Sequence, residues 1–430
     1  MALDPLAKDV LPKARAVVVV GAGIIGVACA LRLAEQGKRV CVLDPQPPGQ
    51  GASFGNAGHL ATEQVFPIAD WSIVKRLPAM LLDPMGPLRL DWRYLPSALP
   101  WFARLLLNLR PAPLNRTVAG LRALNEASLG AWQRLLRTAG ISGALKEEGS
   151  LLAFERPASR PALNELARRM RAQGVAVDLW QADTLRAAAP SLSHRLQGGL
   201  FFPQTGHFVD PYQVLLGLVA AAKAAGVRFE RARVNQAWLT PQGVTLATDH
   251  GRIGCSQVLI ACGAHSAALT HALTGQRVPL DTERGYHLML PREMNRLPFA
   301  VTSLERRFIM TPLAGGLRLA GTVEFAGLER PPNMGRAWQL HALSHGLFQH
   351  PLNADEATPW MGFRPSLPDS LPVIDCVADG RVLLAFGHQH LGLTQAAITA
   401  EWIAGLANAD QAEKLNRGLH LSAYRLARFK

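Results

Sequence analysis

The most constraining feature of the sequence is a glycine pattern near its N-terminus. Gly21, Gly23 and Gly26 follow the β-branched run 16–20 and precede a helical stretch that ends near Gly37. A second strand-like stretch comes next, so the segment is typical of a β-α-β unit. The first glycine permits a tight turn, the second lets a pyrophosphate approach the backbone, and the third lets helix and strand pack closely. The pattern therefore predicts a dinucleotide-binding unit with the pyrophosphate at the helix N-terminus.

An acidic residue at the end of the second strand supports this prediction. Asp44 follows Gly26 by 18 residues, a position from which a carboxylate can accept hydrogen bonds from ribose hydroxyls. The alternative interpretation is a glycine-rich structural turn that binds nothing. NAD and FAD proteins share the fingerprint, so the choice between these cofactors depends on residues outside it.

Composition limits the class of protein more than its function. The chain has 430 residues, 49% of them hydrophobic, which favours two domains over one. A formal net charge of +13 favours anionic substrates, anionic lipid head groups or nucleic acid without choosing among them. The 5 cysteines contain no C-x-x-C pair, so we expect no disulfide framework, no zinc ribbon and a reducing compartment. The apolar stretch 16–31 is shorter than the ~20 residues of a membrane-spanning helix.

Seven elements, distributed over nearly the whole chain, carry a resemblance to a known family. They are VVVVGAGIIG (17–26), SFGNAG (53–58), HFVDP (207–211), VLIACGAHS (258–266), RGYHL (284–288), GFRPSLPDSLPVI (362–374) and FGHQHLGLTQA (386–396). With these elements the chain resembles the glycine/D-amino acid oxidase family of flavoproteins, and within it the bacterial D-amino acid dehydrogenases. An NAD-dependent dehydrogenase would keep the glycine fingerprint but has no use for the second and seventh elements.

The resemblance implies an α/β fold with two domains. An FAD-binding Rossmann-type domain would be built from separated segments and joined to a substrate-binding domain with a mixed β-sheet. Two α/β portions of the sequence bracket a β-rich middle, as this arrangement requires. The expected FAD-binding segments are 12–70, 208–276 and 366–422, and the expected substrate-binding segments are 71–207 and 277–365.

The resemblance also implies a reaction and its partners. FAD would accept a hydride from a D-amino acid, giving an imine that hydrolyses to a 2-oxo acid, with electrons passed to a quinone or similar acceptor. D-proline or hydroxy-D-proline, glycine or sarcosine, and an oxygen-using oxidase remain alternatives. We expect no nucleic-acid partner, since no basic run is interleaved with stacking aromatic residues. The expected location is the cytoplasm, with peripheral contact at the inner face of the membrane as an open alternative.

The expected cofactor site collects residues from all of these motifs. By resemblance, the amides of 387–394 face the pyrimidine edge of the flavin, where a helix N-terminus stabilises negative charge. Cys262 stands where the family has a threonine, and we interpret it as an inert buried thiol. The predicted cofactor-binding residues are Gly21, Gly23, Ile24, Ile25, Gly26, Asp44, Ser53, Asn56, Ala57, Gly58, Val234, Cys262, Gly263, Gly387, His388, Gly392, Leu393 and Thr394.

Two residues are predicted to contact the substrate. A guanidinium can bind a carboxylate through two parallel hydrogen bonds, and the resemblance places the carboxylate-binding arginine at Arg364. The hydroxyl of Tyr286 is the predicted second contact. The alternative for Arg364 is a structural ion pair with Asp369 or Asp375.

Three histidines and one long segment have open interpretations. His388 and His390 lie two residues apart without a third ligand nearby, so we expect no metal site. For His59 we expect a solvent-facing or hydrogen-bonding imidazole, with a covalent flavin link as the less favoured alternative. The segment 71–110 is rich in Pro, Trp, Leu and Arg and predicts short amphipathic helices. These helices would either cap the substrate domain or contact a membrane surface.

Overall fold

A largely parallel sheet forms the centre of the nucleotide-binding half. The computed structural model describes residues 16–67, 88–408 and 421–430. Six strands lie in the order β10-β2-β1-β14-β21-β20, and every neighbouring pair is parallel except β20 with β21. The strands are β1 (Ala16–Val20), β2 (Arg39–Asp44), β10 (Arg228–Arg231), β14 (Gln257–Ile260), β20 (Val373–Val377) and β21 (Val382–Phe386).

Both faces of this sheet are covered, as the β-branched run of β1 requires. Val17 and Val19 pack into a core with the helices on one face, while Val18 and Val20 pack into a second core on the other. The first face carries α1 (Ile24–Glu35), α4 (Pro111–Thr138), α7 (Pro211–Ala224) and α10 (Gly392–Leu406). The second carries β11 (Val234–Thr240), β12 (Gly243–Thr248), β13 (Gly251–Cys255) and α8 (Ser266–Thr274).

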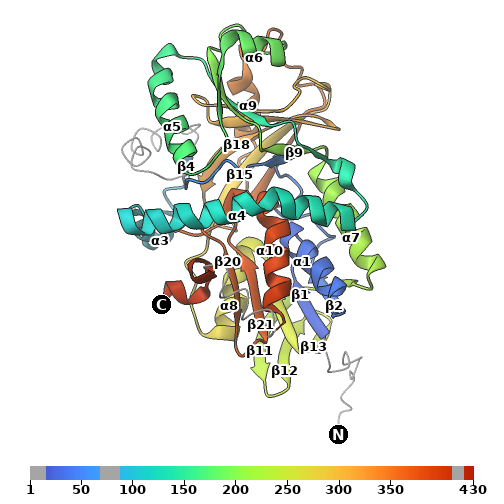
Figure 1. The fold of residues 1–430 in the computed structure, drawn as a ribbon. Helices are drawn as coiled ribbons and strands as arrows, with labels where there is room; N and C mark the ends of the chain where they lie inside the picture. Colours follow the sequence, from blue (N-terminus) through green and yellow to red (C-terminus); the bar gives the residue numbers. More distant parts are fainter. Residues whose placement is uncertain (1–15, 68–87, 409–420) are drawn as a thin grey trace.

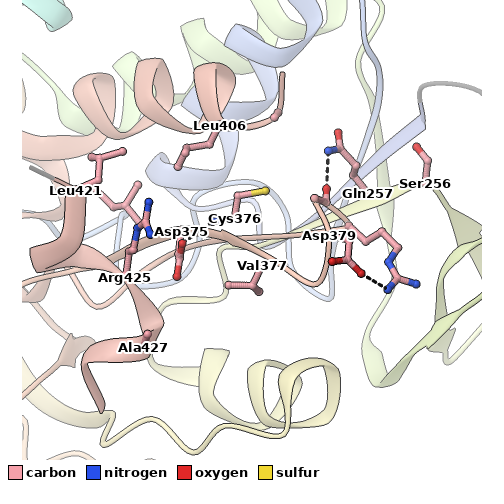
Figure 2. Close-up of a pocket in the computed structure, with 14 residues that line it drawn as sticks. Ser256, Gln257, Asp375, Cys376, Val377, Asp379, Leu406, Leu421, Arg425 and Ala427 are labelled. Atoms are coloured by element: carbon pink, nitrogen blue, oxygen red, sulfur yellow. Dashed lines mark hydrogen bonds and ion pairs between the residues drawn. The ribbon is translucent and has the colours of Figure 1, made fainter. Parts of the chain in front are cut away.

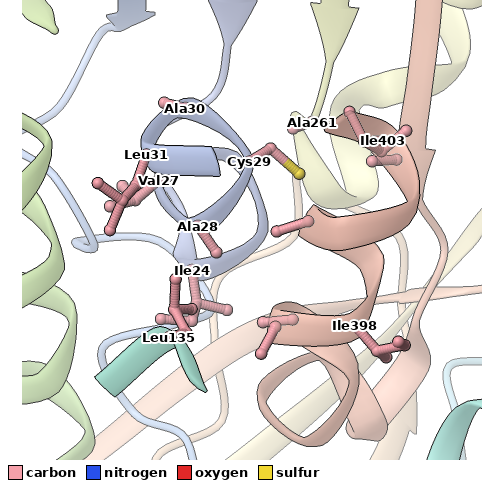
Figure 3. Packing of buried hydrophobic residues seen from close by; sticks show 14 of the residues in the cluster. Ile24, Val27, Ala28, Cys29, Ala30, Leu31, Leu135, Ala261, Ile398 and Ile403 are labelled. Atoms are coloured by element: carbon pink, nitrogen blue, oxygen red, sulfur yellow. The ribbon is translucent and has the colours of Figure 1, made fainter. Parts of the chain in front are cut away.

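Helices α1 and α10 pack directly against each other. Figure 3 shows the small side chains Ala28 and Cys29 of α1 pointing toward α10, which contributes Ile398 and Ile403. Cys29 is fully buried, and burial raises the pKa of its thiol. The predicted βαβ unit is thus locked to the C-terminal helix, so distant parts of the chain share one core.

A larger mixed sheet forms the other half of the molecule, at the top of Figure 1. Its order is β19-β15-β18-β17-β16-β6-β8-β7, and β4 pairs with β18. The strands are β4 (Leu88–Leu90), β6 (Ser150–Phe154), β7 (Asp178–Gln181), β8 (Gly198–Phe202), β15 (Asp281–Leu290), β16 (Ala300–Ser303), β17 (Phe308–Leu313), β18 (Gly316–Phe325) and β19 (Thr358–Ser366). The helices are α3 (Leu95–Asn108), α5 (Arg160–Ala172), α6 (Ala182–Ala188) and α9 (Gly335–Ser344). The two-domain α/β fold class expected from the sequence is confirmed.

Small elements connect the halves. A three-stranded sheet is formed by β3 (His59–Leu60), β9 (Gly206–Phe208) and β5 (Leu145–Lys146). Helix α3 falls in the segment 71–110 and confirms one of the amphipathic helices expected there. Residues 71–87 of that segment lie outside the described residues.

Helix α4 is not among the elements expected from the sequence. It has 28 residues, begins at a favourable Pro111, and crosses the molecule against α10 (Figure 1). Trp132 is fully buried in this contact, and its indole Nε1 donates to the carbonyls of Leu393 and Thr394 at 2.9 and 3.1 Å. The ring also meets Phe208 edge-on. Trp132 therefore fixes α4 against the start of α10.

We propose the domain division expected from the sequence, with one qualification from packing. All strands of the six-stranded sheet fall within 12–70, 208–276 and 366–422. All strands of the mixed sheet fall within 71–207 and 277–365, apart from the last residue of β19. Helix α4, although it lies between 71 and 207, packs in the core of the nucleotide-binding half.

Replacing Trp132 tests the importance of the contact between α4 and α10. We expect Trp132→Ala to lower the free energy of unfolding by about 3 to 5 kcal/mol, because a large buried ring and its hydrogen bonds are lost. Urea denaturation measures the change. Trp338 on α9 is 43% exposed, so Trp338→Ala is the control and should change stability by less than about 0.5 kcal/mol. Equal urea midpoints for the two variants would show that the contact of Trp132 with α10 does not stabilise the protein.

Candidate functional site

A large cavity opens where the parallel strands end. Strands β1, β14 and β21 all have their carboxyl ends at this edge, which is where ligands bind in doubly wound sheets. The cavity has a volume of about 1300 Å³ and is lined by residues of both sheets. It therefore runs from the predicted cofactor site into the substrate-binding half.

Most of the predicted site residues line this cavity. Those that do are Gly21, Gly23, Ile24, Ile25, Asp44, Ser53, Asn56, Ala57, Val234, Cys262, Gly263, Tyr286, Arg364, Gly387, His388, Gly392 and Leu393. Gly26, Gly58 and Thr394 do not. Each of these three residues contacts and supports residues that line the cavity, as described below.

The three fingerprint glycines have different surroundings. A Cβ on Gly21, whose φ is +111°, would lie 2.3 Å from the carbonyl oxygen of Ala261. One on Gly26 would lie 1.9 Å from the carbonyl oxygen of Gly21. At Gly23 the nearest atom would be Ser53 Oγ at 3.3 Å. Gly21 and Gly26 are thus required for packing. At Gly23 an open space remains at the N-terminus of α1, and we call this space the cradle.

Asp44 and Ser53 border this cradle. Asp44 Oδ2 accepts a hydrogen bond from the amide of Ala22, and Oδ1 accepts one from the amide of Gln46, both at 2.8 Å. The side chain is thereby oriented at the cavity wall, and each oxygen keeps a second lone pair for a ribose hydroxyl. The hydroxyl of Ser53 accepts from the amide of Ile24 at 2.9 Å.

Cys262 has a structural position beside the same cradle. Its thiol donates to the carbonyl of Val20 at 3.2 Å, and burial raises its pKa to about 12. A protonated, hydrogen-bonded thiol is unreactive. This agrees with its interpretation as an inert residue.

The SFGNAG loop is held from the substrate-binding sheet. Arg318 of β18 donates to the carbonyl of Asn56 at 2.5 Å, and His287 Nδ1 of β15 lies 2.9 Å from the carbonyl of Gly55. Burial and the nearby Arg318 lower the pKa of His287 to about 3, so the imidazole is neutral. The side chain of Asn56 accepts from the amide of Gly58 at 2.9 Å. The loop is therefore fixed by both halves of the molecule.

The start of α10 is tied to the segment after β3. Thr394 Oγ1 accepts from the amide of Ala61 at 3.0 Å, which explains its burial away from the cavity. His388 Nε2 lies 3.0 Å from Thr399 Oγ1, and burial lowers the pKa of His388 to about 3. His390 Nε2 lies 2.5 Å from Gln64 Oε1. Among the described residues no His, Cys, Asp or Glu cluster could hold a metal ion.

His59 is a buried, hydrogen-bonded residue. Its Nδ1 lies 3.0 Å from the carbonyl of Gly206, and its Nε2 lies 3.0 Å from Glu63 Oε1. Burial opposes the charged form, but Glu63 and the Gly206 carbonyl outweigh it, so the pKa of His59 is raised. The hydrogen-bonding interpretation is confirmed, and the solvent-facing one is wrong.

Arg364 on β19 reaches the substrate end of the cavity. Its guanidinium lies against Gly285 of β15, where a Cβ would come within 2.4 Å of Cζ. Its Nη1 donates to the carbonyl of Thr322 at 3.3 Å. Burial lowers its pKa, and the nearby Glu283 raises it. Within the described ranges, no carboxylate oxygen lies within 4.0 Å of this guanidinium.

The alternative ion pairs of Arg364 are absent. Asp369 pairs with Arg428 at 2.6 Å. Asp375 accepts from the amides of Cys376 and Leu426, both at 2.8 Å. The interpretation of Arg364 as a staple to these two aspartates is therefore wrong.

Tyr286 also lines the cavity, but its hydroxyl is engaged within the protein. It donates to Glu324 Oε2 at 2.5 Å and accepts from the amide of Asn333 at 3.2 Å. Burial, followed by the hydrogen bond to Glu324, raises the pKa of Tyr286 to about 12. The hydroxyl proton is thus committed to Glu324 in this structure, which leaves the predicted contact with substrate without geometric support.

Comparison with known proteins identifies the family. A model of the DAO family, FAD dependent oxidoreductase, matches residues 16–406. The chain belongs to this family. A D-amino-acid oxidase of Bradyrhizobium diazoefficiens is 36% identical, covering 94% of this chain and 97% of the relative. A D-amino acid dehydrogenase of Dechloromonas aromatica is 30% identical, covering 90% and 97%. The solved structure of glycine oxidase from Geobacillus kaustophilus has a TM-score of 0.73 at 21% identity, covering 96% and 98%.

FAD is therefore the cofactor, and the cavity fits it. The cradle at Gly23 lies at the N-terminus of α1, where free backbone amides and the helix dipole favour a diphosphate. Val234 and Cys262 line the cavity beside Asp44, so we propose that they hold the adenosine end. The SFGNAG loop and the start of α10 lie toward the substrate sheet, so we propose that they hold the flavin ring.

Trp360 is a cavity residue that sequence reasoning missed. A Cβ on Gly55 or Gly362 would come within 2.1 or 2.0 Å of its indole, so both glycines make room for it. The indole also stacks on His287, with ring centroids 5.0 Å apart. Gly55 and Gly362 are part of the SFGNAG and GFRPSLPDSLPVI motifs. That both contact Trp360 could not be predicted from the motifs, because strand pairing brings the three residues together.

A second hollow lies at the opposite end of the six-stranded sheet (Figure 2). It has a volume of about 770 Å³ and borders the amino ends of β14 and β21. Gln257 donates to the carbonyl of Gly380, and Arg381 pairs with Asp379. These side chains already have partners within the protein, and the hollow is remote from the carboxyl ends of the parallel strands, where doubly wound sheets bind ligands.

A substitution at Gly23 tests the cradle. We expect Gly23→Val to yield protein depleted of FAD, because the side chain would occupy the position of the diphosphate. The visible absorbance of the purified protein measures flavin content. Gly254→Val is the control, since a Cβ there meets nothing within 4 Å. Full flavin content in Gly23→Val would show that the diphosphate binds elsewhere.

Proposed function

We propose that this enzyme oxidises the Cα–N bond of D-amino acids. The product is an imine, which water hydrolyses to a 2-oxo acid and ammonia. The observation that carries the proposal is Arg364, a cation in the cavity wall without a carboxylate partner among the described residues. Relatives named D-amino-acid oxidase and D-amino acid dehydrogenase support the choice of substrate.

Arg364 is suited to bind the substrate carboxylate. A buried guanidinium is costly, as the lowered pKa of Arg364 reflects even with Glu283 nearby, and an anionic ligand offsets this cost. The side chain is fixed by Gly285 beneath it and by the carbonyl of Thr322 beside it. A bound carboxylate would therefore be oriented as well as attracted.

The remaining residues position the substrate and keep water away. Trp360, Phe308 and Leu152 line the substrate end of the cavity and make its wall apolar there. The positive charge of Arg364 also favours the neutral form of a nearby amino group, whose nitrogen lone pair forms the C=N bond as hydride leaves Cα. Bound FAD supplies the hydride acceptor, and the chain supplies orientation. No acid–base pair is required for this reaction.

We propose that electrons then pass to a quinone or similar acceptor at a membrane surface. None of the helices in the described ranges combines the length and hydropathy of a membrane-spanning segment. Helix α3 instead exposes apolar side chains, with Leu99, Leu106 and Leu107 exposed by 55, 43 and 53%. Arg104 and Arg110 are exposed near them. Apolar and basic side chains together favour binding to anionic lipid.

Substitution of Arg364 tests the carboxylate site. We expect Arg364→Lys to retain FAD and fold but to lose about 2 to 5 kcal/mol of substrate binding, because a lysine cannot form both hydrogen bonds. Amines that lack a carboxylate should be affected far less. KM for both classes of substrate measures the difference.

Arg284 provides the matched control. Its guanidinium is fully buried and donates to the carbonyls of four residues, namely Ala326, Gly327, Arg330 and Pro331. Arg284→Lys should therefore lower thermal stability. If Arg364→Lys lowers stability and leaves KM unchanged, Arg364 is structural.

Substitutions on α3 test the membrane contact. Leu99→Glu combined with Leu107→Glu should reduce sedimentation with anionic vesicles, because apolar contact is lost and negative charge is added. Leu179→Glu on β7 is the control, since Leu179 is also exposed, by 43%. Wild-type protein that ignores anionic vesicles at low salt would remove the membrane proposal and favour a soluble acceptor such as oxygen.

A further inference from the structure

A β-bulge interrupts the pairing of β15 with β18 at the substrate end of the cavity. Arg284 pairs with Glu324, but Tyr286 pairs with Gly321, so the register shifts between them. Two residues of β18, Thr322 and Val323, thus stand opposite the single residue Gly285. Bulges of this kind redirect a side chain, and they are frequent beside active sites.

Thr322 has an unfavourable backbone conformation at this bulge. Its φ is +57°, in the left-handed region that a β-branched residue rarely adopts. Glycine or asparagine would fit there with less strain. Residues held in such strained backbone conformations are concentrated at functional sites. The choice of threonine therefore needs an explanation in its side chain.

The side chain of Thr322 is polar, buried and without a partner. The residue is 5% exposed and lines the cavity. Its Oγ1 has no hydrogen-bond partner in the structure. A buried hydroxyl without a partner is unfavourable, so the side chain is suited to a ligand that the cavity receives.

The bulge and Arg364 form one unit. The carbonyl of Thr322 accepts from Arg364 Nη1 at 3.3 Å, and the guanidinium lies against Gly285, the residue opposite the bulge. Thr322 and the guanidinium are therefore neighbouring groups at the same wall of the cavity. Because an ionised carboxylate only accepts hydrogen bonds, a hydroxyl beside the guanidinium adds a third donor to the two of the arginine.

We propose that Thr322 is a second substrate-binding residue, whose hydroxyl donates to the carboxylate held by Arg364. This inference rests on the proposed function. It assigns to Thr322 the second contact that the sequence assigned to Tyr286, whose hydroxyl donates to Glu324. Thr322 lines the cavity, and rotation about χ1 is the movement that would turn its buried Oγ1 toward a bound carboxylate.

Removing the hydroxyl while keeping the shape of the side chain tests the proposal. The probe is acetate, a carboxylate without an amino group, whose binding is followed through the visible spectrum of the oxidised holoenzyme. We expect Thr322→Val to weaken acetate binding by about 10-fold or more, as for a hydrogen bond to a charged group. KM for a D-amino acid should rise by a similar factor and kcat should change less. Thr322→Ser should stay within about 3-fold of wild type.

A second variant separates the hydroxyl from the backbone. Glycine adopts a φ of +57° without strain and keeps the carbonyl that binds Arg364, so Thr322→Gly should fold and bind FAD. It should lose acetate affinity as Thr322→Val does. If Thr322→Val, or Thr322→Gly where the valine variant does not fold, binds acetate as wild type does, the proposal is overturned.

The outcome is distinguishable from failure of the proposed function. If the wild-type enzyme oxidises D-amino acids and Arg364→Lys weakens acetate binding, but the Thr322 variants do not, only the role of Thr322 is wrong. If Arg364→Lys also leaves acetate binding unchanged, the carboxylate site itself lies elsewhere, and the assignment of Thr322 is overturned with it.

Discussion

The close packing of β1, α1 and β14 around two glycines is the constraint on which the site depends. Gly26 lies against the carbonyl of Gly21, and Gly21 lies against the carbonyl of Ala261, with no room for a Cβ at either position. These contacts bring the carboxyl ends of the parallel strands to the N-terminus of α1. The cradle at Gly23 and the cavity beyond it follow from this geometry.

The mixed sheet completes the cavity and provides the second half of the site. His287 and Arg318 hold the carbonyls of Gly55 and Asn56. The SFGNAG loop, which borders the cavity, is thus positioned by the sheet that carries Arg364. This coupling places the loop and Arg364 at the walls of one cavity.

The sequence predicted the parts of the site whose chemistry is local. Glycines after a strand and an acid at the end of the next strand are recognisable from their neighbours in the chain, whereas the role of the arginine before a proline was predicted from the family resemblance. The family resemblance supplied FAD and the two-domain arrangement. The burial of His59 was partly misjudged, because Glu63 and Gly206 become its partners only through the fold.

The parts that depend on strand pairing could not be predicted. The register of β15 with β18 and β19 brings Gly285, Thr322 and Arg364 together, and nothing in their sequence spacing reveals it. The same register commits Tyr286 to Glu324. Helix α4 was not predicted from the sequence. The apolar residues on its buried face find their packing partner, α10, only in the folded protein.

A D-amino acid should reduce the flavin while its carboxylate is held in the cavity. The most direct measurement is the visible absorbance of the bound flavin under anaerobic conditions, after addition of D-alanine, L-alanine, D-proline, glycine, sarcosine or ethylamine in turn. We predict rapid bleaching by at least one D-amino acid, little by L-alanine, and little by ethylamine, which lacks the carboxylate. Bleaching by L-alanine or ethylamine as fast as by the D-amino acids, or no bleaching by any D-amino acid, would contradict the account.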